Sequence, residues 1–186
     1  MQKRHIITAL ILGAIGLSQT AKADALPDGA AAYASDLQNA KTSKKLIVKG
    51  FFLGMTRAET RYLISTSYSK EFSVPGVELN LGTLLGERGG LKADADFAFD
   101  QNDRLISYTW GTRIVNPLFN VPDMTPNDFA QSFSNNYPVP TLDWIAVDGN
   151  KSYWAYASPD GWKVIVFEDK SLRVFQIPAS TDRKFN

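Results

Sequence analysis

Gly54-Met55-Thr56-Arg57-Ala58-Glu59 is the segment around which this chain is organised, and it has the pattern of a helix start. The Thr56 hydroxyl can accept a hydrogen bond from a first-turn N–H while the Glu59 carboxylate reaches back to the Thr56 N–H, which is the capping-box arrangement. The pattern predicts a helix from Arg57 to about Tyr68. That helix ends before Val74-Pro75-Gly76, because proline cannot continue a helix.

The same pattern returns 69 residues later as Asp123-Met124-Thr125-Pro126-Asn127-Asp128. Thr125 takes the N-cap position, and Pro126 occupies the first helical position, where its missing N–H costs nothing. In both copies a tyrosine follows the methionine after 13 residues, as Tyr68 and Tyr137. The repetition predicts a duplicated structural unit.

Residues 1–23 have the three parts of a secretory signal peptide in the expected order. Two cations precede the apolar run Ile6–Leu17, and Ala21-Lys22-Ala23 forms an Ala-x-Ala cleavage site before Asp24. The apolar run is too short for a spanning helix. We therefore expect cleavage after Ala23, a periplasmic or secreted mature protein, no membrane span and, since no Cys follows the site, no lipid anchor.

Removal of residues 1–23 leaves 163 of the 186 residues and lowers the formal net charge from +1 by three, to −2, because Lys3, Arg4 and Lys22 are lost with no acid. A near-neutral chain has no basic patch for nucleic acid. The cut also removes His5, the only histidine, and the chain has no Cys. These absences exclude Ser-His-Asp and Cys-His catalysis, zinc or haem ligation through imidazole or thiolate, and disulfides.

The remaining chain divides into three parts. Residues 24–45 are a leader segment, either a short helix capped near Asp28 or a loosely attached stretch. Residues 46–118 form the first α/β unit and residues 119–186 the second, with a proline-containing link over 116–122. The glycine-rich stretch 79–90 lacks the P-loop and dinucleotide-binding patterns, so a connecting loop is expected there.

A β-hairpin is expected over 93–110. Apolar residues alternate with polar ones over 93–99, and Asp100-Gln101-Asn102-Asp103 has turn chemistry before Leu105–Trp110. A four-residue loop would place Phe97 opposite Ile106 and Ala95 opposite Tyr108 on one apolar face. The other face would be solvated and would carry Asp94, Asp96, Ser107 and Thr109, so this sheet is covered on one side.

The second unit is expected to contain four strands after its helix. They are predicted at Leu142–Val147, Ser152–Ala157, Trp162–Phe167 and Leu172–Ile177, separated by turn-forming residues. The predicted fold class is therefore α+β, with two tandem units that each pack a helix on an antiparallel β-meander.

The acidic residues of the first hairpin do not have the spacing of a calcium loop. Asp94, Asp96, Asp100 and Asp103 lack the Asp-x-Asp-x-Asp-Gly order and the closing Glu. We expect no metal and no cofactor. An enzymatic alternative, a carboxylate- or Ser/Lys-dependent envelope hydrolase, would draw on a set of neighbouring residues, namely Lys92, Asp94, Asp96, Asp100 and Ser107.

The signal peptide, the two units of about 70 residues and the Gly54-Met55-Thr56 helix start together resemble two groups of proteins. One has the β-lactamase-inhibitor-protein-like (BLIP-like) fold. The other comprises small outer-membrane-assembly proteins of the SmpA/OmlA type, whose helices also commonly open on Gly-Met-Thr. The resemblance implies a non-catalytic protein-binding module, such as an inhibitor or an envelope-assembly accessory. The chain departs from it in lacking the inhibitors' disulfides and the lipoproteins' acylated Cys.

Comparison of the two units predicts where a partner docks. An offset of 68 residues maps Phe97 onto Ile165 and Phe99 onto Phe167, so both second-unit residues should face the helix. The opposite face, solvated in the first unit, becomes apolar and aromatic in the second. Its expected partner-binding residues are Tyr153, Trp162, Val164, Arg173 and Phe175. The alternative is that the chain itself covers this face, since monomers rarely expose large apolar patches.

Overall fold

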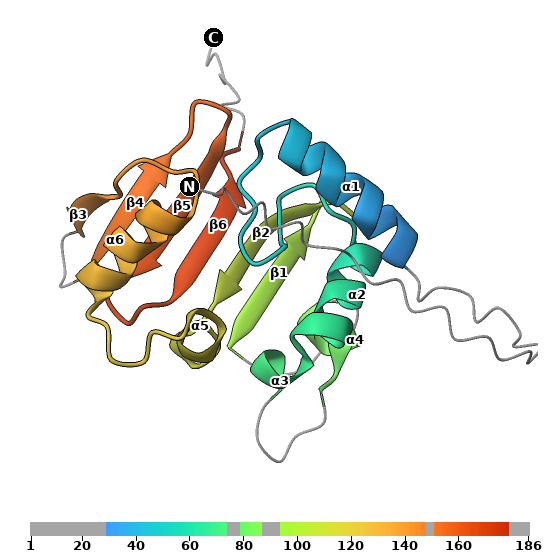
Figure 1. The fold of residues 1–186 in the computed structure, drawn as a ribbon, viewed down its shortest axis with the longest axis horizontal. Coiled ribbons are helices and arrows are strands. Elements are labelled where there is room, and N and C mark those ends of the chain that lie inside the picture. The colour runs from blue at the N-terminus through green and yellow to red at the C-terminus, as the bar shows by residue number, and fades with distance from the viewer. Residues whose placement is uncertain (1–28, 74–78, 87–93, 148–150, 179–186) are drawn as a thin grey trace, which may run out of the picture.

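The computed structural model describes residues 29–73, 79–86, 94–147 and 151–178 (Figure 1). Its helices are α1 (Ala30–Thr42), α2 (Arg57–Ser67), α3 (Ser69–Phe72), α4 (Leu81–Leu84), α5 (Thr112–Phe119) and α6 (Pro126–Asn136). Its strands are β1 (Ala95–Phe99), β2 (Leu105–Trp110), β3 (Asp143–Val147), β4 (Lys151–Ala157), β5 (Trp162–Phe167) and β6 (Leu172–Gln176). In these ranges no helix combines the length and apolar character needed to cross a membrane.

Both helix starts are confirmed. The Thr56 hydroxyl accepts from the Glu59 N–H at 3.2 Å, and the Thr56 N–H donates to the Glu59 carboxylate at 2.5 Å. The Thr125 hydroxyl accepts from the Asp128 N–H at 3.2 Å, with Pro126 at the first helical position. The first helix ends one residue before the predicted boundary.

The strands form one antiparallel sheet in the order β1-β2-β6-β5-β4-β3 (Figure 1). The fold class is α+β, as predicted. The hairpin β1–β2 joins the meander β3–β6 through the pairing of β2 with β6, in which Tyr108 lies opposite Val174. Two described strands lie between α2 and α6 in the chain, whereas four follow α6. The tandem duplication stays a prediction.

The register of the first hairpin differs from the expected one. Phe97 pairs with Tyr108 and Ala95 with Trp110, two positions further along β2 than the four-residue loop implied. The predicted apolar face therefore exists with a different membership. Tyr108 and Trp110 are fully buried, whereas Ile106 is only partly buried.

Two local features cause this shift. The Asp100 N–H donates to the Arg104 carbonyl at 2.8 Å, which leaves a three-residue loop whose last residue, Asp103, has φ 59°. Ile106 is then left unpaired, because Ala98 pairs with Ser107 and Phe99 with Leu105. The shorter loop and the β-bulge each move the register by one residue.

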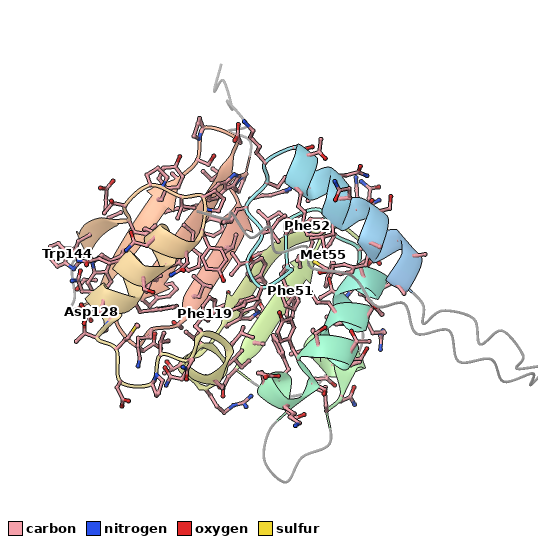
Figure 2. All side chains as sticks on the ribbon, in the orientation of Figure 1. Phe51, Phe52, Met55, Phe119, Asp128 and Trp144 are labelled. Atoms are coloured by element: carbon pink, nitrogen blue, oxygen red, sulfur yellow. The ribbon has the colours of Figure 1, made fainter. Side chains whose placement is uncertain are left out.

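One face of the sheet carries the core. Every described helix contributes to a single buried cluster, with Ala40, Leu63, Phe72, Leu84, Ile114 and Phe129 among its members. Phe51 lies at the centre of the part of this core that residues 46–118 contribute (Figure 2). Its ring centroid is 5.1 to 6.2 Å from those of Tyr68, Phe72, Phe97, Tyr108 and Trp110.

Three helices were not predicted. α5 occupies part of the expected link and contains Pro117, and it buries Ile114, Val115 and Leu118. Proline costs nothing among the first four N–H groups of a helix, which have no intrahelical partner, but Pro117 lies beyond them and removes one helical hydrogen bond. Burial of the apolar residues therefore stabilises α5 despite the proline. α3 extends the first helix past a break at Tyr68, and α4 lies in the stretch expected to be a loop.

The leader segment forms α1 over its described part, which confirms the helix alternative there; Asp28 lies outside the described residues. α1 packs against α2, and the rings of Tyr33 and Tyr62 are 5.7 Å apart. The Tyr33 hydroxyl donates to the Gly50 carbonyl at 3.2 Å. These contacts attach the segment to the first half of the core.

Candidate functional site

The sheet face opposite the core is not covered by any described helix, because those helices all pack on the other face. Antiparallel ladder partners point to the same side, so the register identifies the members of each face. In β1 and β2 the uncovered face is polar and carries Asp96, Ser107 and Thr109. In β4 to β6 it is largely apolar. We call this part the open face; it consists of Tyr153, Ala155, Ala157, Lys163, Ile165, Phe167, Arg173 and Phe175.

Two cations of the open face fold back over its aromatic rings. Lys163 Nζ lies 5.5 Å from the ring centroid of Tyr153, and Arg173 Cζ lies 4.8 Å from that of Phe175. Arg173 is the ladder partner of Ile165, and Ile165 is only 8% exposed although no described helix covers it. Because Arg173 lies opposite Ile165 in the ladder, its aliphatic stem can shield this apolar side chain from water. Among the described residues, neither cation has a carboxylate within ion-pair distance.

The five residues expected to bind a partner do not share one face. Tyr153, Arg173 and Phe175 lie on the open face, but Trp162 and Val164 point to the core. Val164 is fully buried and pairs with Val174, and Trp162 packs against the core cluster. The predicted orientation of β5 is therefore wrong, and its open-face members are Lys163, Ile165 and Phe167.

The cause is the turn before β5. The Ser158 N–H donates to the Trp162 carbonyl at 2.8 Å, which closes a three-residue loop in which Gly161 has φ 80°. A shift of one residue moves every side chain of a strand to the other face. The constant offset of 68 residues used in the prediction therefore does not carry the register of the first hairpin over to β4 and β5. The sequence signal was Pro159-Asp160-Gly161, since three-residue hairpins place Gly at a left-handed third position.

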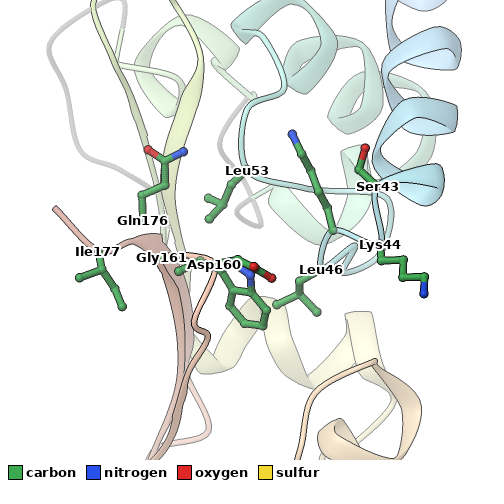
Figure 3. Close-up of a pocket in the computed structure, with 10 residues that line it drawn as sticks. Ser43, Lys44, Leu46, Leu53, Asp160, Gly161, Gln176 and Ile177 are labelled. Carbon is green, nitrogen blue, oxygen red and sulfur yellow. The ribbon is translucent and has the colours of Figure 1, made fainter. Parts of the chain in front are cut away.

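A cavity of about 650 Å³ lies where residues 43–53 meet the turn before β5 and the end of β6 (Figure 3). Figure 3 shows Lys44 and Leu46 on one side and Asp160 and Ile177 on the other. Trp162 lines this cavity. Solvent therefore reaches Trp162 at the end of the sheet, on the core side, and not across the open face.

A second cavity, of about 340 Å³, is lined mainly by the aromatic cluster of α5 and α6. Lys49 Nζ lies 5.1 Å from the Phe119 ring centroid. Burial raises the pKa of Tyr137 to about 12, so this phenol is neutral at physiological pH. The lining contains no carboxylate, and Tyr137 cannot act as a base there near neutrality.

The acidic residues of the first hairpin have structural partners. Asp94 lies 2.7 Å from Arg113 Nε, and Asp103 lies 2.7 Å from Arg57 Nε. The Asp100 carboxylate accepts two backbone N–H groups of its own turn, both at 2.8 Å. These contacts connect the hairpin to the helices and order its loop.

The residues of the enzymatic alternative do not come together in either cavity. Asp94 and Asp100 flank opposite ends of β1, while Asp96 of β1 and Ser107 of β2 lie on the polar face of the hairpin. Lys92 lies outside the described residues. Neither of the two cavities is lined by any of them.

Comparisons with protein-family models, curated proteins and solved structures find no match to this chain. Within the described ranges, no group of three or more His, Cys, Asp or Glu side chains is placed to hold a metal ion. The surface of the sheet is thus the feature from which a function can be argued.

Proposed function

We propose that this protein is a secreted or periplasmic, non-catalytic protein-binding module that uses its open face to bind a partner. The partner would be an envelope or secreted protein with an apolar patch surrounded by carboxylates, bound as an inhibitor's target or as an assembly client. The observation that carries the proposal is the open face itself, in which half-buried aromatic rings alternate with two cations that lack described carboxylate partners.

The chemistry of the open face suits a protein interface. Tyr and Arg are enriched among residues that dominate binding energy, and aromatic rings supply contact area at low entropic cost. Lys163 and Arg173 now rest on the Tyr153 and Phe175 rings. A partner carboxylate would compete for these cations and expose the rings beneath them. Binding would then bury the half-buried rings of Tyr153 and Phe175, whose transfer from water is favourable.

The test is a comparative pull-down from the envelope and secreted fractions with the protein lacking residues 1–23. Lys163→Glu with Arg173→Glu reverses both cations of the open face. We expect this variant to lose a protein that the unaltered chain retains, because like charges now face each other. Retention that weakens as salt rises would agree with this electrostatic account.

The matched control is Lys41→Glu with Lys70→Glu, which makes the same charge change on exposed positions of α1 and α3. This control should still retain the partner, and both variants should keep the circular dichroism spectrum of the parent. Equal retention by both variants, or equal loss, would refute binding through the open face.

A further inference from the structure

β3 is an outer edge of the described sheet, and its one charged residue is Asp143, at its first position. Among the described strands it pairs only with β4, and Figure 1 places it at the margin of the molecule with no labelled element beyond it. Asp143-Trp144-Ile145-Ala146-Val147 contains no Pro or Lys, and its ladder with β4 runs without a bulge. Edge strands are usually protected by these features, because their unpaired N–H and C=O groups otherwise recruit another strand.

β3 also carries an exposed tryptophan. Trp144 is 59% exposed, more than Met124 at 38% or Ile177 at 40%, and Figure 2 shows it at the margin of the molecule. The opposite edge of the sheet differs, because α4 contacts β1. A backbone edge without a partner among the described strands and an exposed indole therefore occur together on β3.

The sequence of β3 is complementary to itself in an antiparallel arrangement. A two-fold axis through Ile145 would place Trp144 opposite Ala146 of a second copy, so that each indole covers a small side chain. It would place Ile145 opposite its own copy and Asp143 opposite position 147. Both copies of Asp143 would then lie at opposite ends of the ladder, where they do not repel one another.

The backbone permits the same arrangement. Along an edge strand, the N–H and C=O groups of alternate residues point outward. When a two-fold axis passes through one residue, each outward N–H of one strand lies opposite an outward C=O of the other. This holds whether the odd-numbered or the even-numbered residues point outward. Pairing in this register needs no change in β3 and would extend the sheet across the axis.

We infer that the protein forms a two-fold symmetric dimer in which β3 pairs antiparallel with β3 of a second copy around Ile145. The dimer joins two six-stranded sheets into one continuous sheet. The contact is isologous, so it closes with two copies and leaves no further β3 edge exposed. The open face lies on other strands and stays available in both copies.

The absence of cysteine makes a direct test possible. Ile145→Cys introduces one thiol per chain at the two-fold axis, where antiparallel partners have Cα atoms about 4.5 to 5.5 Å apart, within disulfide range. Mild oxidation should convert this variant to a covalent dimer. Asp143→Cys is the control on the same strand; its copies would be roughly 14 Å apart along the ladder, four residues at about 3.4 Å each, and should not cross-link.

A charge test checks the register without cross-linking. Trp144→Glu with Ala146→Glu places carboxylates opposite one another and should give a monomer by analytical ultracentrifugation over an about 100-fold range of concentration. Trp144→Glu with Ala146→Lys places opposite charges across the same pairs and should remain a dimer, with a dissociation constant that rises with salt. Both variants should keep the parent's circular dichroism spectrum.

Three results would overturn the inference. The first is that the unaltered protein is monomeric over the whole concentration range. This includes the case in which β3 pairs with a strand of a different protein and not with a second copy. The second is a dimer that persists in the double-glutamate variant. The third is a cross-link that forms as readily through position 143 as through position 145.

Discussion

Each N-cap threonine accepts a hydrogen bond from the backbone N–H three residues later, but the two bonds lie in different surroundings. Glu59, which closes the cap of α2, is fully buried, whereas Thr125 and Asp128 at the start of α6 are both exposed. A cap bond that is shielded from water has less competition from solvent. The same residue pattern should therefore contribute unequally to stability.

We predict that Thr56→Ala lowers the free energy of unfolding by about 1 to 2 kcal/mol and Thr125→Ala by about 0.5 to 1 kcal/mol. Urea unfolding of both variants measures the difference. Thr56→Ser, which retains the hydroxyl, serves as the control and should lose much less than the alanine variant. Equal losses at both positions would contradict the argument from burial.

Tyr108 carries a polar atom that the core does not satisfy. Its side chain is fully buried, and its hydroxyl has no hydrogen-bond partner within the described part of the chain. An unsatisfied buried hydroxyl costs about 1 to 3 kcal/mol. We predict that Tyr108→Phe leaves the free energy of unfolding unchanged or raises it by up to about 1 kcal/mol.

The measurement for Tyr108→Phe is again urea unfolding, with Tyr33→Phe as the control. The Tyr33 hydroxyl donates to the Gly50 carbonyl, so its removal should destabilise the protein. Destabilisation by Tyr108→Phe that equals the loss at Tyr33 would indicate that the Tyr108 hydroxyl does have a partner.

Three hairpins of the sheet use the same kind of loop. In each, the last residue of a three-residue loop has positive φ, namely 59° at Asp103, 80° at Gly161 and 66° at Lys170. Each loop is closed by a backbone bond at 2.8 or 2.9 Å between the flanking residues. Loop length controls register, so this shared geometry determines which side chains of β5 and β6 reach the core.

The two faces of the meander can be separated by single substitutions. We predict that Trp162→Ala, which removes a ring packed against the core, lowers the free energy of unfolding by about 3 kcal/mol or more. Phe175→Ala, on the open face, should cost about 1 kcal/mol or less, because its half-buried ring contributes little to the core.

Thermal or urea unfolding measures both, and partner retention supplies a second readout. Phe175→Ala should weaken binding while the fold persists. The reverse order of stability losses would mean that the open face is covered within the chain.

The whole molecule is joined across its two halves by the pairing of β2 with β6. Because of this pairing, aromatic residues of the first half and aliphatic residues of the second belong to one core. Tyr108 and Tyr137 lie in different halves of that core. Burial raises the pKa of Tyr108 well above its usual value and that of Tyr137 to about 12.

We predict that the free energy of unfolding falls as pH rises from about 10 to about 12. Below about pH 10 both phenols are neutral in the folded and unfolded chains, and their contribution is constant. Above it they ionise in the unfolded chain first, since their folded pKa values are raised, and each favours unfolding by up to about 1.4 kcal/mol per pH unit.

Urea unfolding across this pH window measures the loss. The variant Tyr108→Phe with Tyr137→Phe removes both groups and should lose stability less steeply. A slope identical to that of the unaltered protein would show that other groups cause the alkaline transition.

Much of the local structure could be predicted. The starts of α2 and α6 and the approximate positions of all six described strands follow from caps, turn residues and alternation. α5 was missed because Pro117 suggests a break, and its apolar stripe becomes informative only when the core is known. The candidate site was predicted in part: the aromatic face exists, with Tyr153, Arg173 and Phe175, but two of its five expected residues belong to the core.

By itself, the sequence determined the helix starts, the strands and the chemistry that the chain lacks, because these depend on residue type and on partners within about four positions. Only the tertiary structure decided which side of β5 faces solvent, how β2 joins β6, and that β3 is an edge. Those features depend on register and on contacts such as Tyr108 with Val174, which lie far apart in the chain. A one-residue change in a loop reverses a strand's faces while leaving its composition unchanged, so residue patterns alone do not distinguish the two outcomes.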